Sequence, residues 1–245
     1  MNVLIACEES QRVCMAFRER GFNAYSCDIQ EESGGHPEWH IQGDCLPLLN
    51  GNCSFTTRGG QTVTIDDKWD LIIAHPPCTY LSNVAMRNHS LKCTQLTSIN
   101  ARTQKRIEGM LFFMAFVNAN CKYIAVENPV GVMNICYRKP DQVIDPYMFA
   151  KNVDDVENYV TKRTCLWLKN LPLLAGNDLP RPDNLKLFGV NPSGKISNWV
   201  ERVTGKDRAK ERSKTFEGIA RAMAIQWGGY IKGDFIPDRY GQLSF

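Results

Sequence analysis

The chain has 245 residues, of which 43% are hydrophobic and 22% are charged, and its formal net charge is +3. This composition is typical of a globular protein with a buried core, and the lack of any run of about 18 apolar residues argues against a membrane span. The net charge is too small to indicate a nucleic-acid partner by itself. Acidic residues follow the first apolar run directly, without the basic region of a secretory signal.

Ten cysteines are spread along the chain, and none of them forms a C-x-x-C pair. Several, such as Cys7 and Cys165, lie inside apolar runs, which is typical of reduced and buried thiols. Because no secretory signal is evident, we expect no disulfide framework and predict a cytoplasmic protein without a membrane partner.

Apolar runs of strand length alternate with helical patterns in the first half of the chain. The expected strands cover 2–7, 23–29, a short run that ends near Asp44, 70–75 and 122–131. A helix is expected over 10–21, ending at Gly21, and the Gly59-Gly60 pair predicts a hairpin over 53–65. This alternation predicts an α/β fold with a parallel sheet and covering helices.

The second half of the chain is less regular. Residues 83–118 are expected to form a polar loop and then a helix with an apolar end. A further strand is expected at 163–168, whereas 170–198 is rich in Pro, Gly and Asn and should hold little regular structure. We therefore expect a single domain over 1–245, with a short irregular insert at 170–212.

Four chemically capable side chains stand at the ends of expected strands: Asp28, Asp44, Cys78 and Glu127. Ligands of open parallel sheets bind outside the carboxyl ends of the strands, so this convergence predicts a binding site at that edge. Acids after the second and third strands suit hydroxyl and amino donors, such as those of a nucleoside. Each acid could instead be a helix cap or a turn former.

Two prolines precede Cys78 in "IAHPPCTYLS" (73–82), so the expected strand ends in a stiff turn. Cys78 could be an inert core thiol, a metal ligand or a nucleophile. No second ligand pair follows His75, so we expect no metal site. A nucleophile needs a lowered pKa or a general acid for its substrate, and Glu127 could supply the acid from a neighbouring strand end.

Four segments resemble motifs of the cytosine-C5 DNA methyltransferases, and the first two are the more specific. "WDLIIAHPPCTYLS" (69–82) is similar to the family's nucleophile motif, in which Pro-Cys follows a strand, and "IAVENPVG" (124–131) resembles its Glu-Asn motif. "VTKRTCLWL" (160–168) is weakly similar to the arginine-bearing motif. "TFEGIARAMAIQW" (215–227), which predicts a helix, is similar to the closing helix motif. Short phage-type homologues are the members that the chain resembles most.

The resemblance implies a Rossmann-like methyltransferase sheet and an S-adenosylmethionine-dependent DNA (cytosine-5)-methyltransferase. In this family a thiolate attacks cytosine C6, so Cys78 is implied as the nucleophile and Glu127 as the group that holds or protonates N3. Arg163, or Lys162 beside it, would contact the base carbonyl or the DNA backbone. A cytosine in a duplex must be flipped out of the stack, at a cost of about a few kcal/mol.

The resemblance also implies cofactor contacts at the first three strand ends and in the Pro-Pro turn: Ala6, Cys7, Glu8, Asp28, Ile29, Asp44, Cys45 and Pro76. The family's glycine-rich loop is absent, because "ACEESQRV" (6–13) has Glu8, Glu9 and Ser10 where glycines normally let the backbone approach the ligand. Glu8 could grip the methionine ammonium, or the departure could signal a different cofactor or none.

Two further departures leave the reaction open. A Pro-Pro-aromatic turn is typical of amino-group methyltransferases, and here Cys78 occupies the aromatic position while Tyr80 follows two residues later. The Glu-Asn-Pro element favours the C5 reaction, because it has no role in the other. The segment between "CLWL" and the last predicted helix is short for a target-recognition region. It therefore predicts low sequence specificity, recognition by a partner, or a small substrate.

Basic residues gather in two stretches. The first contains Arg87, Lys92, Arg102, Lys105 and Arg106; the second has seven basic residues between Lys195 and Lys214 against three acids. Each stretch is either a solvated helix face or a surface for DNA phosphates. We expect DNA as the partner, in the cytoplasm of a bacterial or phage-infected cell. The alternatives are a non-catalytic nucleic-acid-binding homologue and a methyltransferase that acts on a free deoxycytidine nucleotide.

Overall fold

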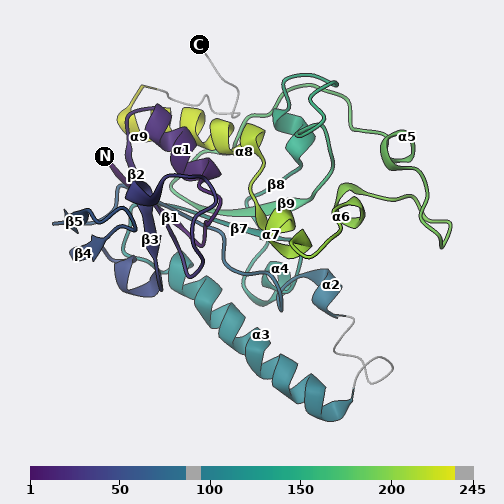
Figure 1. The fold of residues 1–245 in the computed structure, drawn as a ribbon, viewed down its shortest axis with the longest axis horizontal. Coiled ribbons are helices and arrows are strands. Elements are labelled where there is room, and N and C mark those ends of the chain that lie inside the picture. The colour runs from purple at the N-terminus through teal and green to yellow at the C-terminus, as the bar shows by residue number, and fades with distance from the viewer. Residues whose placement is uncertain (87–94, 235–245) are drawn as a thin grey trace.

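The computed structural model describes residues 1–86 and 95–234. Its centre is a seven-stranded sheet with the order β3-β2-β1-β6-β7-β9-β8 (Figure 1). The strands are β1 (Asn2–Ala6), β2 (Asn23–Asp28), β3 (His40–Gln42), β6 (Leu71–Ala74), β7 (Tyr123–Pro129), β8 (Gln142–Ile144) and β9 (Thr164–Lys169). A separate hairpin pairs β4 (Cys53–Thr56) with β5 (Thr62–Ile65), which confirms the hairpin predicted around Gly59-Gly60.

The strands β1, β2, β3, β6 and β7 run parallel. Every residue of β6 is buried, as expected for a parallel strand that is covered on both faces. The predicted α/β fold with a parallel sheet is confirmed in this part. The strand expected at 163–168 is also present as β9, but it runs antiparallel to both of its neighbours. Neither that direction nor the short strand β8 follows from the sequence patterns.

Helices cover both faces of the sheet (Figure 1). One face is covered by α1 (Arg12–Glu19), α8 (Glu217–Ala222), a π-helical turn (Met223–Trp227) and α9 (Gly228–Lys232), and the other by α3 (Leu96–Val117). The helices predicted near both ends of the chain are therefore confirmed. In the part of the chain that the structure describes, no helix is long and apolar enough to cross a membrane.

Alternate side chains of the central strands divide between two cores. Leu4 packs with Phe113 of α3, while its neighbour Ile5 packs with Phe17 of α1 and with Met223. Successive side chains of a strand point to opposite faces, so a single strand anchors both helical layers. Each fully buried Leu, Ile or Phe side chain stabilises this arrangement by about 1.5–3 kcal/mol.

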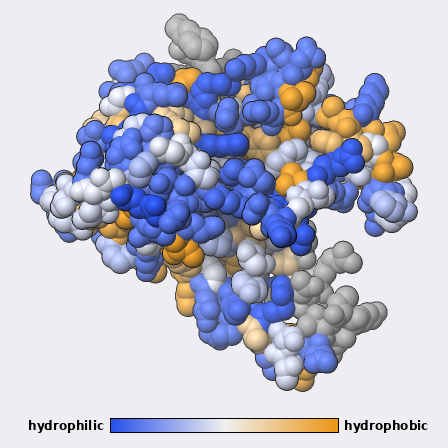
Figure 2. Space-filling view, in the orientation of Figure 1, coloured by the Kyte–Doolittle hydropathy of each residue, from blue (hydrophilic) through white to orange (hydrophobic). Residues whose placement is uncertain are grey.

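The remaining helices are short and connect the larger elements. They are α2 (Asn83–Met86), α4 (Met133–Cys136), α5 (Asn184–Phe188), α6 (Trp199–Arg202) and α7 (Arg208–Ser213). The segment 170–198 contains α5 and an isolated bridge, so the prediction of little regular structure is confirmed there. Figure 2 shows apolar side chains at the surface near α5, where Leu185, Leu187 and Val190 are exposed.

Candidate active site

The strand order of the sheet reverses between β1 and β6, because β2 and β3 lie on one side and β7 on the other. Open α/β sheets bind ligands at such a reversal, outside the carboxyl ends of the strands. Ala74, the last residue of β6, pairs with Ala6 of β1 and with Val126 of β7. The turn that carries Cys78 and the strand end that carries Glu127 therefore lie side by side at this edge.

Cys78 lies in a tight turn beyond β6. Its carbonyl oxygen accepts hydrogen bonds from the N–H groups of Leu81 and Ser82, each at 3.0 Å. Although the residue is exposed, partial desolvation by the surrounding protein raises the pKa of its thiol, the charge of Glu127 raises that pKa further, and Lys162 opposes both. These effects place the thiol, the carboxylate and the ammonium in one electrostatic cluster, in which the resting thiol is protonated at neutral pH.

Glu127 is the mostly buried acid of this cluster, and its side chain is 16% exposed. Its Oε2 accepts a hydrogen bond from Nδ1 of His75 at 3.0 Å. Burial acts to raise the pKa of Glu127, but the hydrogen bond and charge of His75, together with the charge of Lys162, hold it below that of an ordinary glutamate. The resting carboxylate is therefore ionised at neutral pH.

Direct contacts fix the turn after β6 against the end of β7. Buried Asn128 donates from Nδ2 to the carbonyl oxygen of Pro76 at 2.7 Å, and the N–H of Val132 donates to the carbonyl oxygen of Leu81 at 2.8 Å. A Cβ atom at Gly131 would overlap that same carbonyl. The glycine is therefore required for the close approach of the two segments that carry the thiol and the carboxylate.

Lys162, just before β9, brings a cation to the cluster. Its Nζ donates to the carbonyl oxygen of Arg212 at 2.8 Å, and it lies 5.7 Å from the ring centre of Trp199 and 5.5 Å from that of Phe216. Burial lowers the pKa of this lysine, whereas the charges of Glu127 and of the thiolate form of Cys78 raise it. The insert between β9 and α8 thus holds the lysine in place.

Arg163, the cation first assigned to the reaction, lies differently. Its side chain is exposed, and its charge opposes the rise that burial causes in the pKa values of Asp145 and Cys165. The charges that act on the Cys78 thiol include Lys162 and not Arg163. Of the two neighbouring cations considered from the sequence, the structure therefore brings the lysine to the cluster.

The acids after β2 and β3 reach the same edge of the sheet. Burial raises the pKa of the Cys27 thiol, and the charges of Cys45, Asp28 and Asp44 add to this effect. In each acid Oδ1 accepts a hydrogen bond from the N–H two residues later, at 2.9 Å for Asp28 and 3.0 Å for Asp44. Both acids are therefore turn formers, and they also lie close to one another at the end of β2.

The other residues assigned to the cofactor border this edge as well. Ala6 ends β1 and is buried, Pro76 is buried in the turn beyond β6, and Ile29 is 76% exposed after β2. The Sγ atoms of Cys7 and Cys45 lie 3.9 Å apart, so the loops after β1 and β3 meet.

Glu8, the residue considered for the methionine ammonium, caps the helix that follows it. Its two carboxylate oxygens accept hydrogen bonds from the N–H groups of Val13 at 2.7 Å and Cys14 at 3.1 Å, at the start of α1. The loop reaches this shape through left-handed backbone conformations at Cys7 and Gln11 (φ of 60° and 58°). The Glu8 carboxylate is therefore engaged by the helix, and its grip on a methionine ammonium stays a prediction.

The first basic stretch lies beside the Cys78 turn. Arg102 and Lys105 of α3 lie 5.3 Å and 5.7 Å from the ring centre of Tyr80, and Arg106 donates from Nε to the Tyr80 carbonyl oxygen at 3.2 Å. Two members of the predicted stretch lie outside the described residues: Arg87 and Lys92. The described members thus form a cationic surface around Tyr80, which follows Cys78 by two residues.

Three of the seven cations of the second basic stretch have partners within the protein. Lys210 forms an ion pair with Glu9 at 3.4 Å, and Lys214 pairs with Glu211 at 2.7 Å. Arg212 donates to a backbone carbonyl at 2.8 Å. Lys210 and Arg212 therefore tie α7 to neighbouring segments, whereas the Lys214 pair lies at the end of the helix itself.

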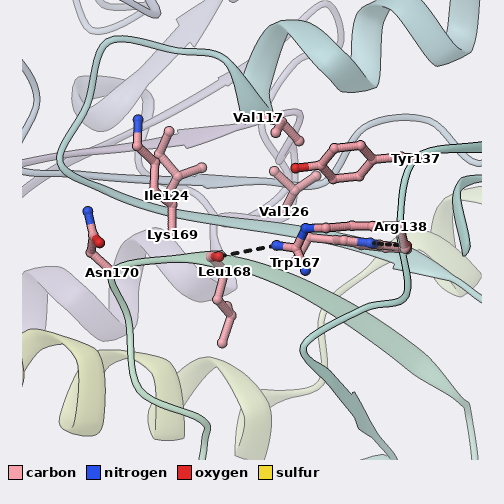
Figure 3. Close-up of a pocket in the computed structure, with 9 residues that line it drawn as sticks. All are labelled: Val117, Ile124, Val126, Tyr137, Arg138, Trp167, Leu168, Lys169 and Asn170. Carbon is pink, nitrogen blue, oxygen red and sulfur yellow. Dashed lines mark hydrogen bonds between the residues drawn. The ribbon is translucent and has the colours of Figure 1, made fainter.

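A cavity of about 290 Å³ lies elsewhere, between the end of α3 and the strands β7 and β9 (Figure 3). Ile124 and Lys169 line it, so it lies at the start of β7 and the end of β9, the edge opposite to Cys78. Its cations have partners within the protein: Arg138 pairs with Asp141 at 2.7 Å, and Lys169 donates to a carbonyl oxygen at 3.3 Å. None of the residues predicted for the site line this cavity.

Two residues of the cluster were not assigned a role from the sequence. His75 and Asn128 each lie inside one of the two quoted motifs, next to Pro76 and Glu127, and this position is the signal that the sequence offers for them. Each makes its contact across the two motifs, between residues 52 positions apart. Such pairing depends on the register of β6 and β7, which a single sequence does not display.

Within residues 1–86 and 95–234, no group of three or more His, Cys, Asp or Glu side chains is placed to hold a metal ion. The groups gathered at the carboxyl edge of the sheet are a thiol, a carboxylate with its histidine, an ammonium and two further acids. Comparison with known proteins adds no relative, since no protein-family model and no curated protein matches the chain.

Proposed function

We propose that the protein is an S-adenosylmethionine-dependent DNA (cytosine-5)-methyltransferase. The observation that carries the proposal is the electrostatic cluster of the Cys78 thiol and the Glu127 carboxylate at neighbouring strand ends. A nucleophile and an acid–base group so placed suit attack on one pyrimidine ring. The order β3-β2-β1-β6-β7 also follows that of doubly wound nucleotide-binding sheets, which supports a Rossmann-like methyltransferase sheet.

The proposed reaction uses the two side chains at different atoms of the base. The proton of the Cys78 thiol passes to Glu127, which donates it to N3 while the Cys78 sulfur attacks C6, so the negative charge that develops in the ring is neutralised. C5 then receives a methyl group, for which S-adenosylmethionine is the donor when bound. A base removes the proton from C5, the C6–S bond breaks, and the thiolate of Cys78 is released as N3 returns its proton to Glu127.

The raised pKa of Cys78 favours a reaction in which the bound substrate helps to activate the thiol. The negative charge of Glu127 helps to raise the pKa of Cys78, so the thiol is a poor nucleophile before the base binds. Once Glu127 has taken the proton of the thiol and shares it with N3, its negative charge is reduced, and so is its contribution to the raised pKa of Cys78. Lys162 then remains as a cation that favours the thiolate.

The residues at the ends of β1 to β3 suit the proposed cofactor. Carboxylates such as Asp28 and Asp44 accept hydrogen bonds from ribose hydroxyls and from an amino group, and exposed Ile29 offers an apolar surface to a purine ring. Glu8 occupies the N-terminus of α1, which is where dinucleotide-binding folds hold phosphate. This arrangement favours a nucleoside cofactor without phosphate groups.

The surface beside Tyr80 supports DNA over a free nucleotide as the substrate. Within the described residues, no carboxylate forms an ion pair with Arg102 or Lys105. Cations on a helix next to the reacting thiol can contact the phosphates on either side of a flipped base. A free nucleotide carries phosphate on one side only.

Methyl transfer from radiolabelled S-adenosylmethionine tests the proposal, with mixed-sequence DNA and free dCTP as separate substrates. We expect labelled 5-methylcytosine in the DNA, no product with Cys78→Ser, and a rate about 10²-fold lower or more with Glu127→Gln. Calorimetry with S-adenosylmethionine is run in parallel.

The other results assign the protein to its alternatives. Labelled N4-methylcytosine would replace the C5 reaction with amino-group methylation, and label in dCTP alone would indicate the free-nucleotide reaction. Absence of cofactor binding at millimolar concentration would leave the non-catalytic, nucleic-acid-binding homologue.

A further inference from the structure

His75 lies where three segments of the proposed active site meet. It follows β6 directly, and its backbone N–H donates to the carbonyl oxygen of Ala6 at 2.9 Å. Its ring donates from Nδ1 to Oε2 of Glu127 at 3.0 Å, and its side chain is 7% exposed. The other ring nitrogen, Nε2, is buried and has no hydrogen-bond partner among the described residues.

Packing alone does not explain a histidine at this position. A buried polar atom without a partner is unfavourable, and an apolar side chain would fill the space without that loss. The interaction that the histidine gains in exchange is the hydrogen bond to Glu127. The carboxylate is the part of the cluster that needs such a partner, because it is largely removed from water.

We propose that His75 is a positioning residue that fixes the orientation and the negative charge of Glu127. This inference rests on the proposed function, in which Glu127 meets N3 of the base. The hydrogen bond from Nδ1 occupies Oε2, so Oε1 is the oxygen left to face the base. An acid–base group held in this way keeps one geometry through the reaction.

The charged groups around the histidine come from each segment packed against it. Glu8 faces it from the loop after β1, where the charge of His75 opposes the rise that burial causes in the pKa of Glu8. Glu127 faces it from β7, Lys162 acts on Glu127 from the segment before β9, and Cys78 lies in the same turn. Without the imidazole, burial would raise the pKa of Glu127, and Lys162 would be the remaining group that lowers it.

The titration of Glu127 tests this role without any use of activity. The protein is labelled with ¹³C at the glutamate side-chain carboxyl carbon, and Glu127→Gln identifies the signal. In the wild type we expect the pKa of Glu127 below that of an ordinary glutamate, and in His75→Leu above it, because burial then dominates. His75→Asn places an amide N–H near the position of Nδ1 and should restore a low pKa, whereas the amide of His75→Gln lies nearer to Nε2 and should not.

Steady-state methyl transfer gives the second readout. His75→Leu should lower kcat by about tenfold or more and leave the KM for S-adenosylmethionine unchanged, and His75→Asn should recover part of kcat. The same Glu127 pKa in the wild type and in His75→Leu would overturn the proposal. If His75→Leu does not fold, equal titration in His75→Asn and His75→Gln would overturn it. A wild type that transfers no methyl group would refute the proposed function, while the NMR titration would still decide the role of His75.

Discussion

Replacing Gly131 by alanine tests whether the two segments of the proposed active site must touch. The added Cβ would overlap the carbonyl oxygen of Leu81 and would lie 2.9 Å from the carbonyl carbon, well inside van der Waals contact. The segments would have to separate, which stretches the 2.8 Å hydrogen bond from Val132 to Leu81. Overpacking costs about 1–3 kcal/mol and a lost hydrogen bond about 0.5–1.5 kcal/mol, so we expect the unfolding free energy to fall by about 2–4 kcal/mol.

Calorimetric melting measures this effect. At roughly 2–4 °C per kcal/mol for a chain of this size, the Tm of Gly131→Ala should fall by about 4–16 °C. Methyl transfer should fall as well, since displacement of a reacting group by about 1 Å can cost about 10²-fold in rate.

Gly109→Ala is the matched control for this substitution. Gly109 lies in α3 and also faces Leu81, but there a Cβ would lie 3.4 Å from the side-chain Cδ2, an ordinary contact. Alanine in a helix interior is favoured over glycine by about 0.8–1.0 kcal/mol, so this variant should melt at or above the wild-type Tm. A Gly131→Ala protein that melts with the wild type would refute the close approach of the two segments.

Four further predictions test separate parts of the site. Because the pKa of Cys78 is raised, the rate of its alkylation by iodoacetamide should rise with pH and show a midpoint above the pKa of free cysteine. Glu127→Gln should lower this midpoint. A wild-type midpoint below the pKa of free cysteine would contradict the cluster. Because the pKa of Glu127 is lowered in the fold, its ionised carboxylate stabilises the fold at pH values above the pKa of an ordinary glutamate. This stabilisation is lost as the pH falls through the lowered pKa, so the urea midpoint of Glu127→Gln should approach that of the wild type in acid. Asn128→Ala leaves the carbonyl of Pro76 without its buried donor and should cost about 1–3 kcal/mol in urea unfolding; an unchanged midpoint would speak against that contact. Glu8→Ala removes a helix cap and should cost about 0.5–2 kcal/mol with little effect on S-adenosylmethionine affinity, whereas a large loss of affinity would restore the ammonium-binding role.

The parallel part of the sheet could be predicted because its strands are short apolar runs between turn signals. The run at Leu71–Ala74 is apolar throughout, and burial on both faces is what that pattern indicates. The direction of β9 has no such local signal, because an apolar strand packs equally well in either direction. The strand β8 has three residues, of which only Ile144 is buried, too few to give a recognisable period.

The candidate site was predictable at the level of strand ends but not of side-chain partners. Cys78 and Glu127 could be expected at one edge, since the carboxyl ends of parallel strands share an edge. The choice between Lys162 and Arg163 was not predictable, because neighbouring residues of an extended segment point in opposite directions. The role of Glu8 depends on left-handed backbone conformations in the loop before α1, and a sequence without glycine there gives no sign of them.

A mechanism-based trap tests the central claim most directly. The protein is incubated with S-adenosylmethionine and mixed-sequence DNA in which 5-fluorocytosine replaces cytosine, so that no proton can leave C5 and the covalent adduct accumulates. The account predicts a stable adduct whose modified peptide contains Cys78 and which Cys78→Ser does not form. Cofactor binding without any adduct, or an adduct that persists in Cys78→Ser, would contradict it.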